Sequence, residues 1–184
     1  SRPVAAWLFG TAGAVALMVT VGGVTRLTKS GLSMTDWKVQ GSLPPLTEAD
    51  WEKEFARYKE YPEWQQRRSM TLDEFKYIFF WEYGHRMLGR ALGLVYGVPL
   101  LYFGLRGHIP SHIRGKVVGL LALGGGQGLV GWWMVKSGLE NRDGDLQSGK
   151  EIRVSPYRLA AHLATAFATF SLLVHTGFQV QGRA

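Results

Sequence analysis

A glutamate, a histidine and two arginines lie close together in one otherwise apolar stretch of the chain. They are Glu82, His85, Arg86 and Arg90. On a helix, Glu82 and His85 are three residues apart and share a face, and Glu82 and Arg86 form an i, i+4 pair of opposite charges. Ionisable residues in so apolar a segment usually have a function, so this cluster is the first candidate site.

A second histidine, His162, lies near the start of another apolar stretch. If both stretches are helices that begin on the same side of a membrane, His85 and His162 lie at similar depth. Two imidazoles on different helices at one depth can ligate a single haem iron from opposite faces. The alternative for each is a hydrogen-bonded core histidine, and spacing alone leaves both open. His175 would lie ~20 Å deeper on the same helix and cannot serve that iron.

Four arginines could bind carboxylates near these histidines. A guanidinium matches a carboxylate with two parallel hydrogen bonds, so arginines are natural partners for haem propionates. The alternative is that each arginine simply extends to the membrane interface. A glycine-rich stretch at residues 124–131 gives another helix a smooth face, which suits close helix packing or a flat macrocycle. The four candidate arginines are Arg26, Arg86, Arg90 and Arg158.

Four stretches of the chain are long and apolar enough to position these side chains inside a membrane. Over the 184 residues the mean hydropathy is near zero and 19% of residues are charged, but the charges are segregated along the chain. A helix of about 20 residues crosses the hydrocarbon layer. None of the four stretches has the polar face that a soluble bundle needs. We therefore predict an all-α integral membrane four-helix bundle, with spans at residues 4–24, 75–105, 117–135 and 157–180.

The distribution of positive charge predicts which side of the membrane each end faces. The connection between the second and third spans carries Arg106, Arg114 and Lys116 and no acid. Positive loops stay inside, so both termini would lie in a bacterial cytoplasm or a mitochondrial matrix. The net charge of +7 comes without a basic block, which argues against a nucleic-acid partner. The chain has no cysteine, so thiolate metal sites and disulfides are excluded.

The long connection after the first span contains a predicted helix of its own. Thr47 followed by acids is typical of a helix N-terminus. Aromatic residues then recur at i, i+4 and i+7 from Trp51. We expect an amphipathic helix that lies on the outer membrane face and is interrupted at Pro62. A similar signal at Thr71 predicts that the second membrane helix begins a few turns outside the bilayer.

These motifs resemble those of haem A synthases, in the right order and over nearly the whole chain. The first motif, GGVTRLTKSGLSM, ends the first span, and another, EYGHRMLGR, contains His85. The cysteine-free outer loop and its long insertion resemble the mitochondrial and alphaproteobacterial branch most. The matching segments are residues 22–34, 74–79, 82–90, 127–139 and 157–163.

The resemblance implies an activity and a role for each candidate residue. Haem A synthases are oxidoreductases that convert the C8 methyl group of haem O to a formyl group, making haem A for cytochrome c oxidase. The conversion passes through successive hydroxylations, and a geminal diol then loses water. The resemblance implies that His85 and His162 are the axial ligands of the haem iron and that Glu82 is an essential acid. It also implies a mitochondrial inner membrane or a bacterial plasma membrane, with haem O synthase and an electron donor as further partners.

The resemblance covers only part of the pattern of the family's longer members. Those have eight spans in two similar halves, and the second half has its own histidine pair and a haem b that passes electrons. Residues 1–184 would thus form a single four-span haem-binding domain that pairs with a second half or with another copy of itself. Two other functions stay open: a bis-histidine haem b cytochrome that only transfers electrons, and an assembly factor without haem. A glutamate one turn before His85 favours the enzyme.

Overall fold

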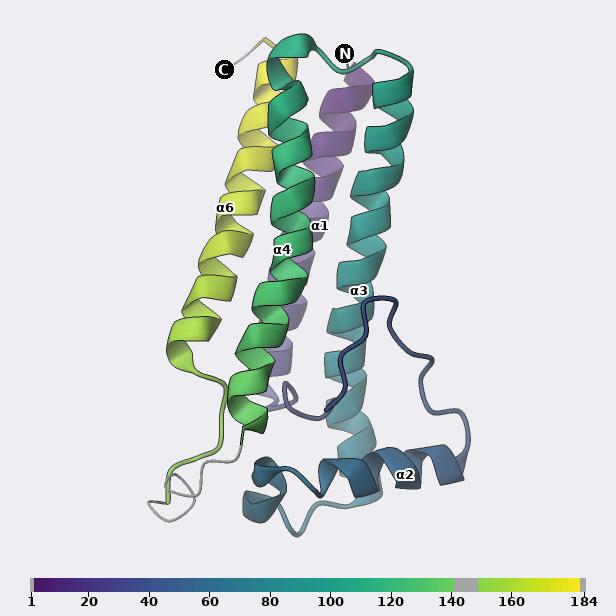
Figure 1. Ribbon diagram of the computed structural model, residues 1–184, viewed down its shortest axis with the longest axis vertical. Helices are drawn as coiled ribbons and strands as arrows, with labels where there is room; N and C mark the ends of the chain where they lie inside the picture. The colour runs from purple at the N-terminus through teal and green to yellow at the C-terminus, as the bar shows by residue number, and fades with distance from the viewer. Residues whose placement is uncertain (1, 141–148, 183–184) are drawn as a thin grey trace.

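Four long antiparallel helices form one bundle in the computed structural model, which describes residues 2–140 and 149–182 (Figure 1). Each is long and apolar enough to cross a membrane. The described residues contain no strand, so the spans satisfy their backbone polar groups as helices. The predicted all-α four-span fold is confirmed. The helices are α1 (Arg2–Leu27), α3 (Leu72–Leu105), α4 (Arg114–Leu139) and α6 (Pro156–Val180).

All four helices extend beyond the predicted spans, because apolar sequence marks only the part inside the hydrocarbon. The start of α3 shows the reason. Thr71 accepts a hydrogen bond from the Glu74 backbone N–H, and the Glu74 carboxylate accepts one from the Thr71 backbone N–H. This reciprocal cap begins the helix before its apolar part, as predicted. At α6, Ser155 caps the first turn and Pro156 occupies the first helical position.

Both termini and the connection between α3 and α4 lie at one end of the bundle, called here the inner end (Figure 1). The half of the bundle next to it is a packed apolar core. The rings of Trp7 and Tyr96 have centroids 4.9 Å apart, and the Tyr96 hydroxyl donates to the Val117 carbonyl over 2.7 Å. This core joins α1, α3 and α4 firmly away from the candidate site. Its other buried members include Val4, Leu8, Ala12, Ile113, Leu120 and Leu173.

The opposite end, called the outer end, carries α2 (Glu48–Tyr58), followed by the short 3-10 helix Pro62–Gln66. Thr47 caps α2 as predicted. The helix crosses the outer end of α3 (Figure 1). We predicted that its apolar face lies on the membrane, but α3 covers that face instead. Phe55 stacks on Phe75 with centroids 4.9 Å apart, and Tyr58 is fully buried. The outer part of α3 supplies this apolar surface by projecting beyond its span.

Candidate functional site

His85 on α3 and His162 on α6 lie in the outer halves of their helices. α3 begins well before its apolar part, whereas His162 is only in the second turn of α6. The extra outer turns of α3 compensate for the different positions in sequence. The structure therefore places both histidines in the outer half of the bundle.

Each imidazole lies against a glycine of another helix. A Cβ atom at Gly22 of α1 would lie 3.0 Å from Nε2 of His85. A Cβ atom at Gly131 of α4 would lie 3.3 Å from Cε1 of His162. Only a glycine leaves this room without displacing the ring. All four helices thus contribute to the site, two with a histidine and two with a glycine.

Several polar atoms near these helices are buried without a hydrogen-bond partner among the described residues. They include Nδ1 of His162, Nε2 of Gln127 and Nε1 of Trp81. Buried polar groups are normally paired, so these unpaired atoms can form hydrogen bonds with a bound molecule. The described residues hold no group of three or more metal-ligating side chains. Two imidazoles between glycine surfaces fit a flat macrocycle whose own nitrogens complete the iron coordination.

The Glu82 carboxylate joins α3 to the segment that follows α1. It is 3% exposed. Its Oε2 accepts hydrogen bonds from Ser33 Oγ over 2.7 Å and from the Met34 backbone N–H over 2.8 Å. Its Oε1 accepts one from Arg86 over 2.5 Å. Hydrogen bonds and a counter-ion are what a buried carboxylate requires, and Glu82 has both.

Arg86 and Arg90 bind the same segment through its backbone. Arg86 donates to the carbonyls of Met34 over 2.9 Å and Asp36 over 2.7 Å. Arg90 donates to the carbonyl of Val39 over 3.0 Å and also to that of Lys38. Together the two guanidinium groups hold residues 34–39 against α3. The sequence suggested that both arginines bind haem propionates. In the structure, backbone carbonyls accept hydrogen bonds from several N–H groups of each guanidinium.

The other two candidate arginines differ from each other. Arg158 on α6 donates to the Trp133 carbonyl over 2.8 Å and lies over the Trp133 ring, 4.7 Å from its centroid. Arg26 is half-buried at the outer end of α1, and its guanidinium has no hydrogen-bond or ion-pair partner within the described parts of the chain. It lies one helical turn beyond Gly22, on the same face of α1. Arg26 is thus the candidate cation best able to bind a carboxylate near His85.

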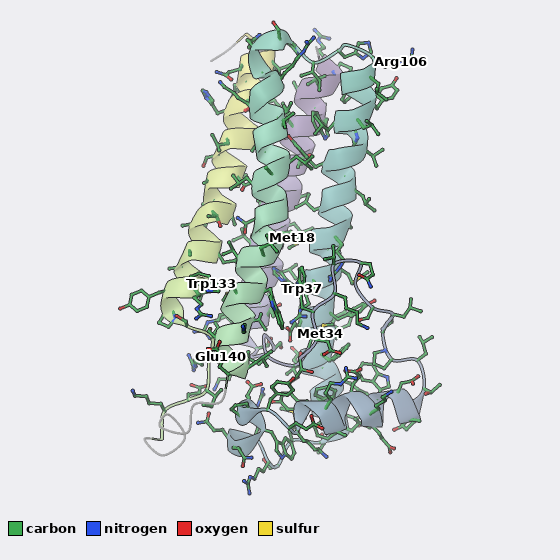
Figure 2. All side chains as sticks on the ribbon, viewed as in Figure 1. Met18, Met34, Trp37, Arg106, Trp133 and Glu140 are labelled. Carbon is green, nitrogen blue, oxygen red and sulfur yellow. The ribbon has the colours of Figure 1, made fainter. Side chains whose placement is uncertain are left out.

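Residues 34–39 also cross from α3 to α4. The ring of Trp37 stacks on Trp132 of α4, with centroids 6.1 Å apart and planes inclined by 26°. Figure 2 shows Met34 and Trp37 in the outer half of the bundle, further out than Met18. Trp132 therefore holds this segment, and Trp133 supports Arg158.

Sequence reasoning missed two buried polar residues of the outer half. Ser33 donates a hydrogen bond to the Glu82 carboxylate. Its position in the sequence motif did not predict this contact. Glu63 lies in the 3-10 helix and is 7% exposed. It follows Pro62 in a stretch rich in charges, where an exposed glutamate is the ordinary expectation. No periodic pattern could have identified its burial, because the helix is only five residues long.

Comparison with known proteins gives consistent matches. The family model COX15-CtaA, described as cytochrome oxidase assembly protein, matches residues 5–184. The chain is 51% identical over 175 residues to Heme A synthase COX15 of Arabidopsis thaliana, covering 95% of this chain and 38% of that protein. It is 49% identical over 176 residues to Heme A synthase of Maricaulis maris, covering 95% and 49%. For Heme A synthase COX15 of Saccharomyces cerevisiae the identity is 48% over 182 residues, covering 98% and 37%. The chain thus spans half or less of the length of these relatives, and no solved structure matches it.

Proposed function

The chain belongs to the cytochrome oxidase assembly protein family COX15-CtaA, and from this premise we propose that it is the catalytic four-helix half of a haem A synthase. Its substrate would be haem O, and the reaction would oxidise the C8 methyl group to a formyl group. The observation that carries the proposal is the pair His85 and His162, each lying against a glycine of another helix. The name of the relatives, Heme A synthase, supports haem A as the product.

In this proposal the described side chains bind and orient the substrate. His85 and His162 would hold the iron of haem O, and Gly22 and Gly131 leave room for the imidazole rings. Arg26 binds a propionate, since its guanidinium has no protein partner among the described residues. Arg86, Arg90 and Arg158 act with it at the outer edge of the site. Bound haem O brings the reacting methyl group and the iron that supplies the redox chemistry.

Glu82 is the proposed acid–base group. It lies one helical turn from His85, which keeps it near any molecule that His85 ligates. Its two hydrogen bonds from residues 33 and 34 fix the carboxylate in one orientation. A carboxylate so fixed can accept a proton from a hydroxylated carbon or from water without reorganising. Arg86 balances its charge while no proton is bound.

Further proposals concern the rest of the protein. The relatives are about twice as long or more, which supports a second four-helix half, or another copy of this chain, as the partner that receives electrons through haem b. A mitochondrial inner membrane or a bacterial plasma membrane is the proposed location. The positive charge of the connection between α3 and α4 supports an inner end on the matrix or cytoplasmic side. Haem O synthase and an electron donor are the proposed further partners.

The function is tested by the haems that cells make. Cells that produce haem O but lack their own haem A synthase would express this chain alone, a candidate second half alone, and both together. Chromatography of extracted haems should show haem A with both chains. Haem O without haem A in that strain, with both chains present in the membrane, would refute the proposal.

A second candidate is a bis-histidine haem b cytochrome that only transfers electrons. One observation favours it: Glu82 already has three hydrogen-bond donors, as a purely structural carboxylate would. The two functions differ in whether the cell's haem O is converted to haem A. A cytochrome would hold haem b with a low-spin spectrum and would leave the haem O of the cell unchanged.

A further inference from the structure

A cavity of about 400 Å³ lies at the outer end of the bundle, on the side of α3 away from His85. Its walls are α2, the outer part of α3 and the connection between α1 and α2, which runs beside α3 (Figure 1). Tyr83, Met87 and Arg90 line it from α3 and follow one another at i, i+4 and i+7, so they share one face. His85 is two residues from both Tyr83 and Met87, which turns it to the opposite face of the helix. The cavity is therefore separate from the candidate haem site.

The connection that forms one wall of the cavity is fixed to α3. Arg90 donates to the Val39 carbonyl over 3.0 Å, and the Tyr83 hydroxyl donates to the Ser42 carbonyl over 3.1 Å. Between these two contacts, Gly41 has a φ of 83°, and a Cβ atom there would lie 3.0 Å from Nε of Arg90. Only glycine adopts this backbone conformation readily and permits so close an approach. The wall of the cavity is therefore preformed.

The charged side chains that line the cavity include two cations without a partner. Two of the three lining acids accept hydrogen bonds from Arg57, and the third, Asp50, accepts two from Thr47. Lys38 and Lys53 also line the cavity, and neither ammonium has a hydrogen-bond or ion-pair partner among the described residues. An anion in the cavity would thus meet two lysines that no carboxylate of this part of the chain neutralises. The three acids are Asp36, Asp50 and Glu54.

The same face of α3 continues towards the inner end as an exposed apolar stripe. Leu94 and Leu101 follow Arg90 at i+4 and i+11, about 6 and 16 Å further along the helix, and are 68% and 63% exposed. Leu43 and Leu46 line the cavity and are also exposed, so the cavity opens to the surface. Because α3 is long and apolar enough to span a membrane, its exposed stripe lies at the depth of lipid acyl chains. The cavity then lies at the depth of the lipid headgroups.

We propose that this cavity binds the headgroup of an anionic phospholipid of the outer leaflet. Lys38 and Lys53 hold the phosphate as point charges, and one acyl chain lies along Leu94 and Leu101. Two features favour a lipid over a soluble anion: the unpaired lysines match its charge, and the exposed stripe continues from the cavity along the membrane span. Basic pockets beside membrane helices recognise anionic lipid headgroups in this way. The bound lipid also holds the connection between α1 and α2 against α3.

The first test measures lipid bound to the purified protein, assembled with its second half, by native mass spectrometry. The probes are phosphatidylglycerol and phosphatidylcholine with the same acyl chains. Phosphatidylglycerol should bind more tightly, and the double substitution Lys38→Gln with Lys53→Gln should lower its affinity by about tenfold or more. Lys59→Gln is the matched control, because Lys59 is exposed next to α2 but does not line the cavity. Equal affinities for the two lipids, or for the double variant and the control, would overturn the proposal.

The second test separates a lipid from a free anion and from a protein that covers the stripe. Excess inorganic phosphate should leave phosphatidylglycerol bound, because phosphate has no acyl chain. Leu43→Ser should weaken binding by about threefold or more, whereas Leu27→Ser, at an equally exposed leucine outside the cavity, should not. Displacement by inorganic phosphate, or cross-linking of a photoreactive label on Leu94→Cys to the second half instead of to lipid, would overturn the proposal. Both tests measure bound lipid, so their outcome does not depend on haem conversion.

Discussion

The imidazole of His85 lies so close to Gly22 that a single added carbon atom would touch it. A Cβ atom at Gly22 would be 3.0 Å from Nε2, closer than carbon and nitrogen normally approach without a bond. His162 and Gly131 repeat the relationship on the other side of the bundle. The glycines therefore decide where each ring can lie, although neither can bind a ligand itself.

Gly22→Ala should weaken or distort haem binding, because the ring of His85 must move to admit the methyl group. An overpacked site of this kind costs about 1–3 kcal/mol. Absorption and electron paramagnetic resonance spectra of the purified protein measure the change in ligation. Gly23→Ala is the control, because a Cβ atom there meets nothing within 4 Å. Equal spectra for the two variants would show that the contact with Gly22 does not position the ligand.

His85→Ala and His162→Ala should each abolish the low-spin bis-histidine haem spectrum. Removing either imidazole leaves one axial position without a protein ligand. Absorption spectroscopy of the reduced protein makes the measurement, and His175→Ala serves as the control because its side chain is exposed further along α6. If both site variants keep the low-spin spectrum, the ligands lie elsewhere in the chain.

The sequence predicted the spans, the helix caps and the histidine pair for identifiable physical reasons. Long apolar stretches permit only helices in a membrane, and Thr47 and Thr71 begin helices through local hydrogen bonds. These signals are local. His85 and His162 could be paired because both of their helices run inward from the same end.

The contacts that support the site could not be predicted in the same way. Arg86 and Arg90 bind backbone carbonyls, which every residue has, so no side chain in the sequence marks the partner. The apolar face of α2 has the same pattern whether it meets a membrane or α3. Glu63 is buried where α2 and the 3-10 helix pack at the outer end, and this burial depends on tertiary packing rather than on its neighbours in sequence.

Glu82→Gln should leave the haem bound and reduce conversion of haem O by about a hundredfold. The amide keeps the size of the side chain and can still accept hydrogen bonds, but it cannot take up a proton. Haem extraction and chromatography give the conversion, and the absorption spectrum gives the bound haem. Trp37→Leu is the control, because it loosens the same segment at its contact with Trp132 and leaves the hydrogen bonds of Glu82 in place. If Trp37→Leu lowers conversion as much, Glu82 acts by holding the segment.

The stability of the protein should fall as pH rises towards neutrality, because Glu63 is buried at the outer end. In the folded chain the pKa of Glu63 is about 7, against 4.5 for an ordinary glutamate. The folded state therefore binds this proton more tightly, so its stabilising effect is complete below pH 4.5 and is lost as pH rises through 7. The loss for this one group is at most about 3 kcal/mol.

Chemical denaturation in detergent, followed by tryptophan fluorescence between pH 5 and 8, measures this dependence. Glu63→Gln should reduce the slope with pH, and Glu60→Gln should keep it. A slope that persists unchanged in Glu63→Gln would assign the dependence to another group.

Arg26→Gln should weaken haem binding more than loss of any comparable exposed charge. The Arg26 guanidinium is half-buried, one helical turn beyond Gly22, and has no partner among the described residues that would compete with a propionate. A hydrogen bond to a charged group contributes about 1.5–3 kcal/mol, so the affinity for haem should fall by roughly tenfold to a hundredfold. Haem titration of the purified chain makes the measurement. Arg106→Gln is the control, because Figure 2 shows Arg106 at the inner end, far along α3 from the site. Equal affinities for the two variants would exclude Arg26 from propionate binding and leave Arg86, Arg90 and Arg158 as the cations to test.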